Sequence, residues 1–475
     1  MHPASFSYIK QGVEIMQQGD TISAIATAMG EGGIGIIRVS GQQAIAVAAA
    51  VFQPASGRPF KEYGGNQMVY GRIIDKTGAI VDEAMALIMR TPHSYTREDV
   101  VELQCHGGIM ALRKTLQLTY QAGARPAERG EFTKRAFLNG RLDLSQAQAV
   151  MDIIGAKTER SLSMAAGHLI GHFSAGIQTM RHDILGQIAH LEAAIDFPED
   201  EIEEFAIADV KQKVNNLVAE INDLVATADT GKILREGLET AIIGKPNVGK
   251  SSLLNALLKE QRAIVTDIPG TTRDIIEEFI NIEGIPLKII DTAGIRETDD
   301  FVEQLGVEKA KTFIDNADLI LVLLDRSKAL TREDEEILLK IKDKKAIILV
   351  NKSDLTEVLD CAYVQTLVQD KKIIKISTID EVGLNELKQE IVNMVYHGKM
   401  PQSEGVFVNN VRQADLLRTV LKNLDEVLLT IESAMPADCI VIDLRTAWEK
   451  LGEITGDFSA DDLLGKIFGS FCIGK

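Results

Sequence analysis

The stretch Gly244-Lys-Pro-Asn-Val-Gly-Lys-Ser251 follows the pattern G-x-x-x-x-G-K-[ST] of a phosphate-binding loop. The apolar residues 240–243 before it predict a strand, and Ser252–Leu258 after it predict a helix. In that context the loop presents backbone N–H groups and a helix N-terminus to phosphate oxygens, while Lys250 reaches the outer phosphates and Ser251 a magnesium ion. The loop alone predicts a site for a nucleoside triphosphate.

Length and composition are those of a multidomain globular protein. At 475 residues two to four domains are expected, and 25% charged and 45% hydrophobic residues are ordinary values. No apolar run approaches the roughly 18 residues of a membrane span, and the N-terminus lacks the pattern of a signal or transit peptide. Four scattered cysteines favour a reducing compartment. We therefore expect a cytoplasmic protein with no membrane partner.

The net charge of −18 argues against a protein that holds nucleic acid mainly by diffuse electrostatic attraction. The best candidate for a local basic patch is the segment from Arg125 to Arg141, which carries five basic and two acidic residues. Composition alone favours a solvated surface there over a nucleic-acid contact.

Three kinds of sequence pattern follow one another along the chain. Short β-like runs broken by glycine, from Thr21 to Gly123, predict a compact α+β domain, and Ser145–Ala228 has helical periodicity. From Ile233 to Tyr396 apolar strands alternate with helices, which predicts a parallel sheet covered on both faces. Helical periodicity resumes after Pro401, so the α/β domain is predicted to be inserted into a helical domain. The predicted boundaries are 1–140, 141–232, 233–398 and 399–475.

Further motifs stand at the ends of the predicted strands and identify the nucleotide. Asp291-Thr292-Ala293-Gly294 offers an aspartate that holds magnesium through water and an N–H that senses the γ-phosphate. In Asn351-Lys352-Ser-Asp354 the Asp354 carboxylate accepts from the N1–H and amine of guanine together, a donor pair that adenine lacks. Together these motifs predict a domain that binds GTP and GDP. The predicted nucleotide contacts also include Asn247, Val248, Gly249, Lys250, Ser251, Ser252, Thr271, the switch threonine Thr272, and Ser377 after the last strand.

Two residues point to an unusual mode of hydrolysis. Ile295 stands where signalling GTPases such as Ras carry the glutamine that orients the attacking water, so Glu303 or Arg296 is the candidate for that role. Asn247 offers a side-chain oxygen beside the β- and γ-phosphates. An alkali cation held there, with backbone carbonyls from Thr266–Thr271, would neutralise charge in the transition state.

Two other patterns favour plain structural roles. Gly30-Glu-Gly-Gly-Ile-Gly35 fits G-x-G-x-x-G but is followed by a β-like run rather than a helix, so a glycine-rich turn is the favoured interpretation over a dinucleotide site. Cys105 and His106 are adjacent in sequence and make poor partners for one metal ion. A structural or ligand-lining role is favoured for His106.

The remaining segments carry a family resemblance. These are Gly33–Gly41, Glu102–Gly108, Arg129–Leu144 and the terminal Phe471-Cys-Ile-Gly-Lys475. With the GTPase motifs they make the chain resemble the MnmE (TrmE) family of tRNA-modification GTPases over nearly its full length. The resemblance implies an N-terminal tetrahydrofolate-binding domain, a helical domain and an inserted GTPase domain. Residues 1–20 precede the usual start of the family.

The resemblance also implies roles for single residues. A site for 5-formyl- or methylene-tetrahydrofolate would lie at Arg38, Glu102, Arg141 and Lys475, with Arg141 in place of the lysine of some relatives. Magnesium would be held by Ser251 and Thr272. The implied potassium ligands are Asn247, Thr266, Ile268 and Thr271. The candidates for catalysis are Glu303 as the water-orienting residue, Asn247, Lys250, Arg296 and Cys472.

Partners follow from the same resemblance. Family members dimerise through their N-terminal domains and act with a flavin-dependent partner, MnmG (GidA), on the wobble uridine of certain tRNAs. The alternative from the residues is a ribosome-assembly switch of the Era/Der kind, which shares the Pro246-Asn247 signature in the phosphate loop. Such a switch has no need of folate.

Overall fold

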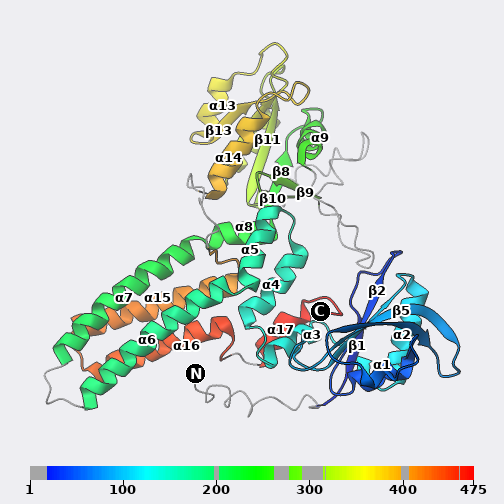
Figure 1. Cartoon of the computed structure of the whole chain (residues 1–475). Coiled ribbons are helices and arrows are strands. Elements are labelled where there is room, and N and C mark those ends of the chain that lie inside the picture. Colours follow the sequence, from blue (N-terminus) through cyan, green and yellow to red (C-terminus); the bar gives the residue numbers. More distant parts are fainter. Residues whose placement is uncertain are drawn as a thin grey trace.

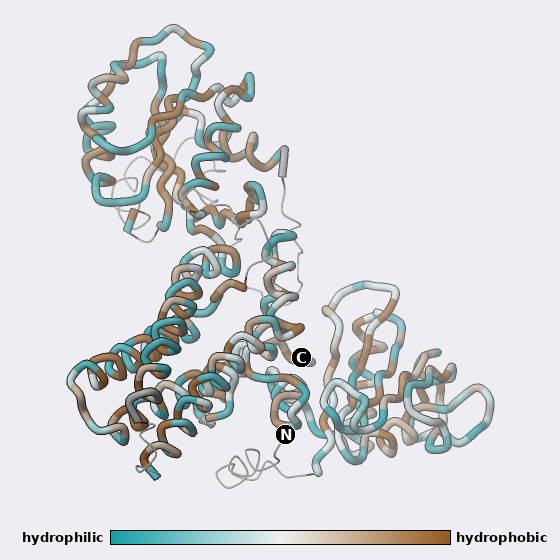
Figure 2. Tube along the Cα trace, turned by 60° about the vertical axis from the view of Figure 1, so that its left-hand side comes forward, coloured by the Kyte–Doolittle hydropathy of each residue, from teal (hydrophilic) through white to brown (hydrophobic). Residues whose placement is uncertain are grey.

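The structure is a computed structural model that describes residues 19–196, 203–261, 278–290, 314–315, 317–396, 406–458 and 461–475. Figure 1 shows a sheet domain from the first part of the chain, an elongated helical domain and an α/β domain. The α/β domain sits at one end of the helical domain, beside α5 and α8 (Figure 1). In Figure 2 the strands of the α/β domain are largely hydrophobic, whereas the long helices alternate between hydrophobic and hydrophilic residues.

The N-terminal domain is built on a seven-stranded sheet in the order β3-β4-β5-β6-β2-β1-β7. Neighbouring strands pair antiparallel, except that β1 and β7 are parallel. The strands are β1 (Ile22–Ile25), β2 (Gly35–Ser40), β3 (Phe52–Pro54), β4 (Gln67–Ile74), β5 (Ile80–Met89), β6 (Val100–Cys105) and β7 (Arg125–Pro126). The helices are α1 (Ala44–Val51), the 3₁₀ turn η2 (Phe60–Glu62), α2 (Ile109–Gln121) and α3 (Glu131–Leu138).

Alternation along β2 decides what each face of this sheet carries. Ile37 and Val39 are buried in the core with residues of α1 and α2. Arg38, between them, points to the opposite face, because successive side chains of a strand alternate. Its direct cross-strand partner is Glu102 on β6. The sheet therefore presents a charged pair on the face opposite α1 and α2, on the side of α3.

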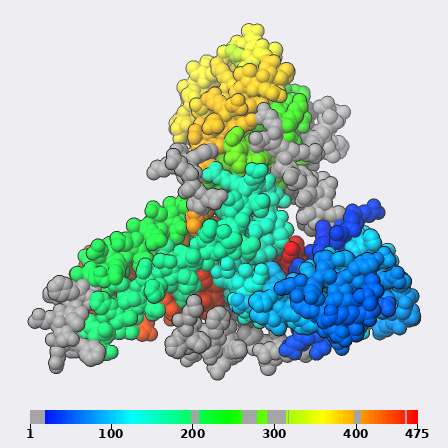
Figure 3. Space-filling view, viewed as in Figure 1, coloured from blue at the N-terminus to red at the C-terminus, as the bar shows by residue number. Residues whose placement is uncertain are grey.

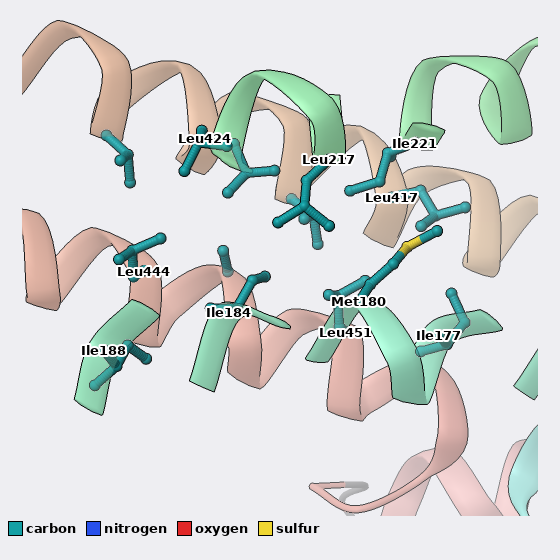
Figure 4. Close-up of a cluster of buried hydrophobic side chains, with 14 of the residues drawn as sticks. Ile177, Met180, Ile184, Ile188, Leu217, Ile221, Leu417, Leu424, Leu444 and Leu451 are labelled. Atoms are coloured by element: carbon teal, nitrogen blue, oxygen red, sulfur yellow. The ribbon is translucent and has the colours of Figure 1, made fainter. Parts of the chain in front are cut away.

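The helical domain is assembled from two separate stretches of sequence. The first contains α4 (Leu144–Gly155), α5 (Glu159–Leu169), α6 (His172–Asp196), α7 (Glu203–Ala226) and α8 (Ala228–Glu236). The second contains α15 (Val411–Glu432), α16 (Ala437–Thr455) and α17 (Asp461–Gly469). Helix α6 packs on α16 and α7 on α15. Their leucine, isoleucine and methionine side chains interdigitate in one core, shown in Figure 4.

The α/β domain lies between these two stretches in sequence, as an inserted domain must. Its six-stranded sheet has the order β13-β12-β11-β8-β10-β9. Separate apolar cores cover its two faces. The strands are β8 (Leu238–Ile243), β9 (Glu278–Ile282), β10 (Ile285–Ile289), β11 (Leu319–Asp325), β12 (Ala346–Asn351) and β13 (Lys372–Lys375). The helices are α9 (Lys250–Gln261), α12 (Arg332–Lys340), α13 (Cys361–Val368) and α14 (Leu384–Tyr396).

One strand corrects the expectation of a fully parallel sheet. β9 was not predicted, and it pairs antiparallel with β10 at the sheet edge through a tight hairpin. Its sequence, Glu-Phe-Ile-Asn-Ile, alternates in burial instead of forming a continuous apolar run, so the search for fully buried strands missed it. Within the described part of the chain, no helix is long and apolar enough to cross a membrane.

Candidate functional site

The phosphate loop connects β8 to α9, as its sequence predicts. Its backbone requires unusual conformations, with φ of +62° at Asn247 and +104° at Gly249. A Cβ on Gly249 would lie 2.2 Å from Nδ2 of Asn351, so glycine is required there for space as well as for conformation. Asn247 is exposed at the crest of the loop. The loop therefore has the tight backbone conformation that its glycines permit.

Lys250 contacts the backbone of its own loop. Its Nζ donates to the backbone oxygens of Gly244 and Lys245, each at 2.8 Å. Burial lowers the pKa of the Lys250 ammonium, because the charged form loses hydration. Anionic phosphate oxygens at this position would compensate that loss, so the arrangement suits binding of a nucleoside triphosphate.

The residues predicted to bind guanine converge on the same edge of the sheet. Asn351, at the end of β12, donates from Nδ2 to the backbone oxygen of Val248 at 2.8 Å. Ser377 donates from Oγ to Oδ1 of Asp354 at 3.0 Å. Lys352 Nζ lies 2.6 Å from Oδ2 of Asp325 at the end of β11. The structure thus brings Asn351, Lys352, Asp354 and Ser377 together with the C-terminal half of the phosphate loop.

The predicted switch and cation residues fall outside the described part of the chain. These are Thr266, Ile268, Thr271, Thr272, Asp291, Thr292, Ala293, Gly294, Ile295, Arg296 and Glu303. Of the predicted magnesium and potassium ligands, Ser251 in the first turn of α9 and Asn247 are described. Ser252 is exposed beside Ser251.

A second constellation forms where the C-terminus returns to the N-terminal domain. Figure 3 shows the C-terminal segment wedged between the helical and N-terminal domains. Ile473 forms a β-bridge with Arg129, and the backbone oxygen of Lys475 accepts from the Phe132 N–H at 3.2 Å. Gly474 has φ of +93°, and a Cβ there would lie 2.2 Å from the Ile25 oxygen. The last residues are thus docked against β1 and α3.

This docking gathers the residues predicted for folate. Arg38 donates from Nε to Oε1 of Glu102 at 2.8 Å and from Nη1 to the Gly474 oxygen at 3.3 Å. The guanidinium carbons of Arg38 and Arg141 lie 5.4 Å and 4.7 Å from the centre of the Tyr95 ring. Burial, and next the charge of Arg38, lowers the pKa of the Lys475 ammonium. Arg38, Glu102, Arg141 and Lys475 therefore share one neighbourhood.

Tyr95 is the member of this constellation that sequence reasoning missed. It lies in the loop between β5 and β6, and its hydroxyl is 2.9 Å from Oγ1 of Thr133 on α3. A lone tyrosine in a loop carries no motif, so the sequence offered no signal for it. The group combines one carboxylate, three cations and an aromatic ring. It suits an anionic ligand that also has a ring and hydrogen-bond donors.

Cys472 lies at the rim of this group. Its side chain is exposed, whereas the preceding Phe471 is buried against Phe468 of α17. The buried phenylalanine anchors the tail and leaves the thiol accessible to solvent.

In the basic segment from Arg125 to Arg141, Arg129 and Arg141 are exposed, whereas two other arginines form ion pairs. Arg135 is buried and contacts Glu131, Glu98 and Asp20 at 2.9 Å, 3.1 Å and 2.7 Å. Arg125 pairs with Glu131 at 2.6 Å. Both arginines belong to an ion-pair network with Glu131 and Asp20, and the interpretation of a solvated surface fails for the buried Arg135. The partners Asp20 and Glu98 lie outside the segment, which is why its composition alone did not reveal them.

The glycine-rich stretch 30–35 and the adjacent residues Cys105 and His106 both lie in the N-terminal domain. The glycine-rich stretch before β2 leads into that strand, and no helix follows it, as expected for a turn. Cys105 is buried in the core, whereas His106 is exposed and its Nδ1 lies 2.7 Å from Oδ1 of Asp82. The two residues therefore differ in burial, with Cys105 in the core and His106 paired with Asp82 at the surface. Among the described residues, no cluster of three or more His, Cys, Asp and Glu side chains forms a metal site.

Comparison with known proteins covers nearly the whole chain. Residues 21–141 match the family described as GTP-binding protein TrmE N-terminus, and residues 144–472 match the MnmE helical domain. A protein of Clostridioides difficile (strain 630) is 50% identical over 456 residues, which is 96% of this chain and 99% of the relative. One of Alkaliphilus oremlandii is 49% identical over 457 residues, with the same coverage. One of Geobacillus kaustophilus is 48% identical over 462 residues, 97% of this chain and 100% of the relative. All three are described as tRNA modification GTPase MnmE. On these matches, the chain belongs to the MnmE (TrmE) family of tRNA modification GTPases.

Proposed function

We propose that this chain is a potassium-activated GTPase that modifies C5 of the wobble uridine of certain tRNAs with a one-carbon unit from tetrahydrofolate. A flavin-dependent protein of the MnmG (GidA) kind would act with it to add an aminomethyl-type group. The observation that carries this proposal is the convergence of Arg38, Glu102, Arg141 and Lys475 from distant segments into one half-buried, largely cationic group.

The chemistry of a reduced folate fits this group. The Glu102 carboxylate would accept from the amide and amine N–H groups of the pterin, as carboxylates do with paired donors. The guanidinium of Arg141 and the ammonium of Lys475 would pair with the glutamate carboxylates. The ring of Tyr95 offers a face for stacking. The folate, when bound, would supply the one-carbon unit, and the exposed Cys472 lies on the same tail as Lys475.

At the nucleotide site the residues divide the work of GTP hydrolysis. Asp354 would select guanine, and Lys250 with the loop N–H groups would hold the phosphates. Ser251 and Thr272 would hold magnesium. Asn247, with Thr266, Ile268 and Thr271, would hold potassium, which supplies positive charge beside the β- and γ-phosphates when bound. Glu303 or Arg296 would orient water. The exposed side chain of Asn247 at the loop crest fits a cation ligand.

The assembly that we propose is a homodimer formed through the N-terminal domains, joined by the MnmG-like partner and tRNA in the cytoplasm. Dimer formation places two GTPase domains in one particle, and potassium would bring them together.

Calorimetric titration with 5-formyl-tetrahydrofolate tests the folate part. The intact chain should bind, whereas a chain lacking residues 472–475 should not, because it loses Lys475 and the contact of Gly474 with Arg38. Arg72→Met is the matched control, because Arg72 forms an exposed pair with Glu83 on the same sheet. Absence of binding to the intact chain, together with co-sedimentation with ribosomal particles, would favour a ribosome-assembly switch instead.

Replacement of potassium by sodium tests the cation part. GTP turnover should be faster in potassium, and Asn247→Ala should remove the difference between the two salts. Equal turnover of the intact chain in both salts would refute a potassium mechanism. The tRNA part is tested separately, since loss of the protein should leave wobble uridines without their C5 group.

A further inference from the structure

The phosphate loop is tied to a helix that carries none of the nucleotide motifs. Lys245, the second residue of the loop, places its Nζ 2.6 Å from Oδ2 of Asp334 and 2.7 Å from Oγ1 of Thr331. Thr331 caps α12, and Asp334 is in its first turn. The side chain of Asp334 is 6% exposed and that of Lys245 22% exposed. This pair is therefore largely shielded from water, where an ion pair holds its geometry better than at a surface.

A cavity makes the tie mechanically important. A hollow of 220 Å³ lies directly beside this contact, and its lining includes Lys245, Asp334, Pro246, Val248 and Leu330. Because Pro246 and Val248 face this hollow, the contact of Lys245 with Asp334 holds the loop at a point where little else packs on it. Loss of the bridge would leave this part of the loop free to shift into the cavity.

The other end of the loop has its own anchor. Asn351 donates to the Val248 oxygen at 2.8 Å. The exposed crest, Pro246 and Asn247, thus spans two fixed points, one on α12 and one on β12. Asn247, whose backbone is in the left-handed conformation, lies between these two points.

The tie reaches Lys250 through the backbone of Lys245. The oxygen of Lys245 is one of two that accept from Lys250 Nζ, both at 2.8 Å. Asp334 therefore fixes the Lys245 side chain, and Lys245 in turn fixes an acceptor that orients the phosphate-binding ammonium. We propose that Lys245 and Asp334 are a pair of positioning residues for GTP hydrolysis. The pair acts on the orientation of the Lys250 ammonium. This effect does not depend on the cation proposed at Asn247 or on the folate site.

Hydrolysis of bound GTP is the step most sensitive to the orientation of the Lys250 ammonium. Charge on the phosphate oxygens is redistributed in the transition state, and a preoriented ammonium stabilises it there more than in the bound ground state. Binding of the nucleotide rests on several loop N–H groups and on Asp354. We therefore expect the pair to act on kcat for GTP hydrolysis rather than on KM.

Steady-state GTP hydrolysis by the full-length protein is the test, with three single variants, the Lys245→Met/Asp334→Asn double variant and a control. Lys245→Met removes the charge at similar length, and Lys245→Arg keeps it. Asp334→Asn removes the carboxylate charge but keeps an oxygen for the Thr331 N–H, so the cap of α12 survives. Lys372→Met is the control, because it breaks an exposed ion pair with Glu386 in the same domain. Thermal melts establish that each variant is folded.

The expected result is that Lys245→Met and Asp334→Asn each lower kcat about tenfold with KM changed less than about threefold. The double variant should be no slower than the single ones, because both remove one interaction. Lys245→Arg should restore most of the rate, and Lys372→Met should match the parent. The proposal is overturned if the single variants keep kcat within about twofold, if the loss appears in KM, or if the two losses multiply. Should Asp334→Asn fail to fold, Lys245→Met against Lys245→Arg decides alone.

Discussion

At the scale of single residues, close backbone approach sets the form of both sites. Gly249 and Gly474 each have positive φ and each lie where an added Cβ would be 2.2 Å from a neighbouring atom. The neighbour of Gly249 is the Asn351 amide, whereas that of Gly474 is the backbone of β1. Neither position tolerates a side chain without movement, so these glycines keep the phosphate loop and the C-terminal tail in place.

Substitution of Gly474 should separate the two sites. Gly474→Ala forces the tail away from Ile25, so we expect it to abolish folate binding and leave GTP turnover unchanged, as measured by calorimetry and phosphate release. Gly78→Ala is the matched control, because Gly78 also has positive φ in the same domain but nothing lies within 4 Å of its added Cβ. The control should cost about 1–3 kcal/mol from backbone strain alone and keep the folate site. Equal folate binding by the parent and Gly474→Ala would show that tail docking does not build the site.

The exposed His106 should titrate anomalously. Its contact with Asp82 favours the imidazolium, and the hydrogen bond together with the carboxylate charge raises its pKa. NMR titration of the histidine ring protons should find His106 above the ordinary value of about 6.5. Asp82→Asn should return it toward that value, with the other histidines as internal references. An unchanged His106 titration in that variant would contradict the assignment of the shift to Asp82.

At the scale of elements, the start of α5 connects the helical domain to the GTPase domain. Thr158 is its N-cap, and its Oγ1 accepts from the Ser161 N–H at 3.1 Å and donates to the Gly284 oxygen at 2.8 Å. Gly284 lies in the turn between β9 and β10. Arg160, two residues on, stacks on Tyr396 at the end of α14, 4.5 Å from the ring centre. The N-terminus of α5 thus contacts two elements of the GTPase domain, the turn between β9 and β10 and the end of α14.

Thr158→Val tests this connection. It removes the cap and the bond to Gly284 while keeping the shape of the side chain. We expect a loss of about 1–2 kcal/mol in the free energy of unfolding, seen as a lower midpoint in urea denaturation followed by circular dichroism. Thr179→Val is the control, because the Thr179 hydroxyl bonds only within α6, to the Ala175 oxygen, among the contacts described for it. If both variants lose the same stability, the connection contributes nothing beyond ordinary helix effects.

At the scale of the whole molecule, the chain returns from the inserted domain beside a buried histidine. His168 on α5 donates from Nε2 to the Phe407 oxygen at 2.7 Å and stacks on Phe173. Asn409, two residues beyond Phe407, donates to Oδ2 of Asp152 at 3.0 Å, and Oδ1 of the same carboxylate accepts from Arg235 at 2.7 Å. The segments that enter and leave the GTPase domain are thus joined to one another through α4.

This buried histidine should make stability depend on pH. Burial lowers the pKa of His168 despite its hydrogen bond, so protonation favours the unfolded chain. The contribution is present above the unfolded value of about 6.5 and is lost as the pH falls below it toward the folded pKa. His168→Gln keeps a donor for Phe407 but does not titrate. Thermal midpoints measured between pH 8 and pH 5 should fall less steeply for this variant than for the parent. Parallel curves would assign the acid sensitivity to other groups.

The sequence by itself determined the guanine-nucleotide domain, the helical flanks and the family. The phosphate loop and the guanine motif are each a contiguous run of residues. The groups that contact one phosphate or one base come from neighbouring positions in the chain, so a local pattern reveals them. Only the tertiary structure decided that Tyr95 lies beside Arg38 and Arg141. It also decided that Arg135 is buried in an ion-pair network and that Lys245 pairs with Asp334. Those partners lie far apart in sequence, and the distance between them is set by the packing of whole elements, which no local pattern records. The edge strand β9 differs from these, because its alternating residues carry a strand pattern, and only its antiparallel pairing with β10 had to come from the tertiary structure.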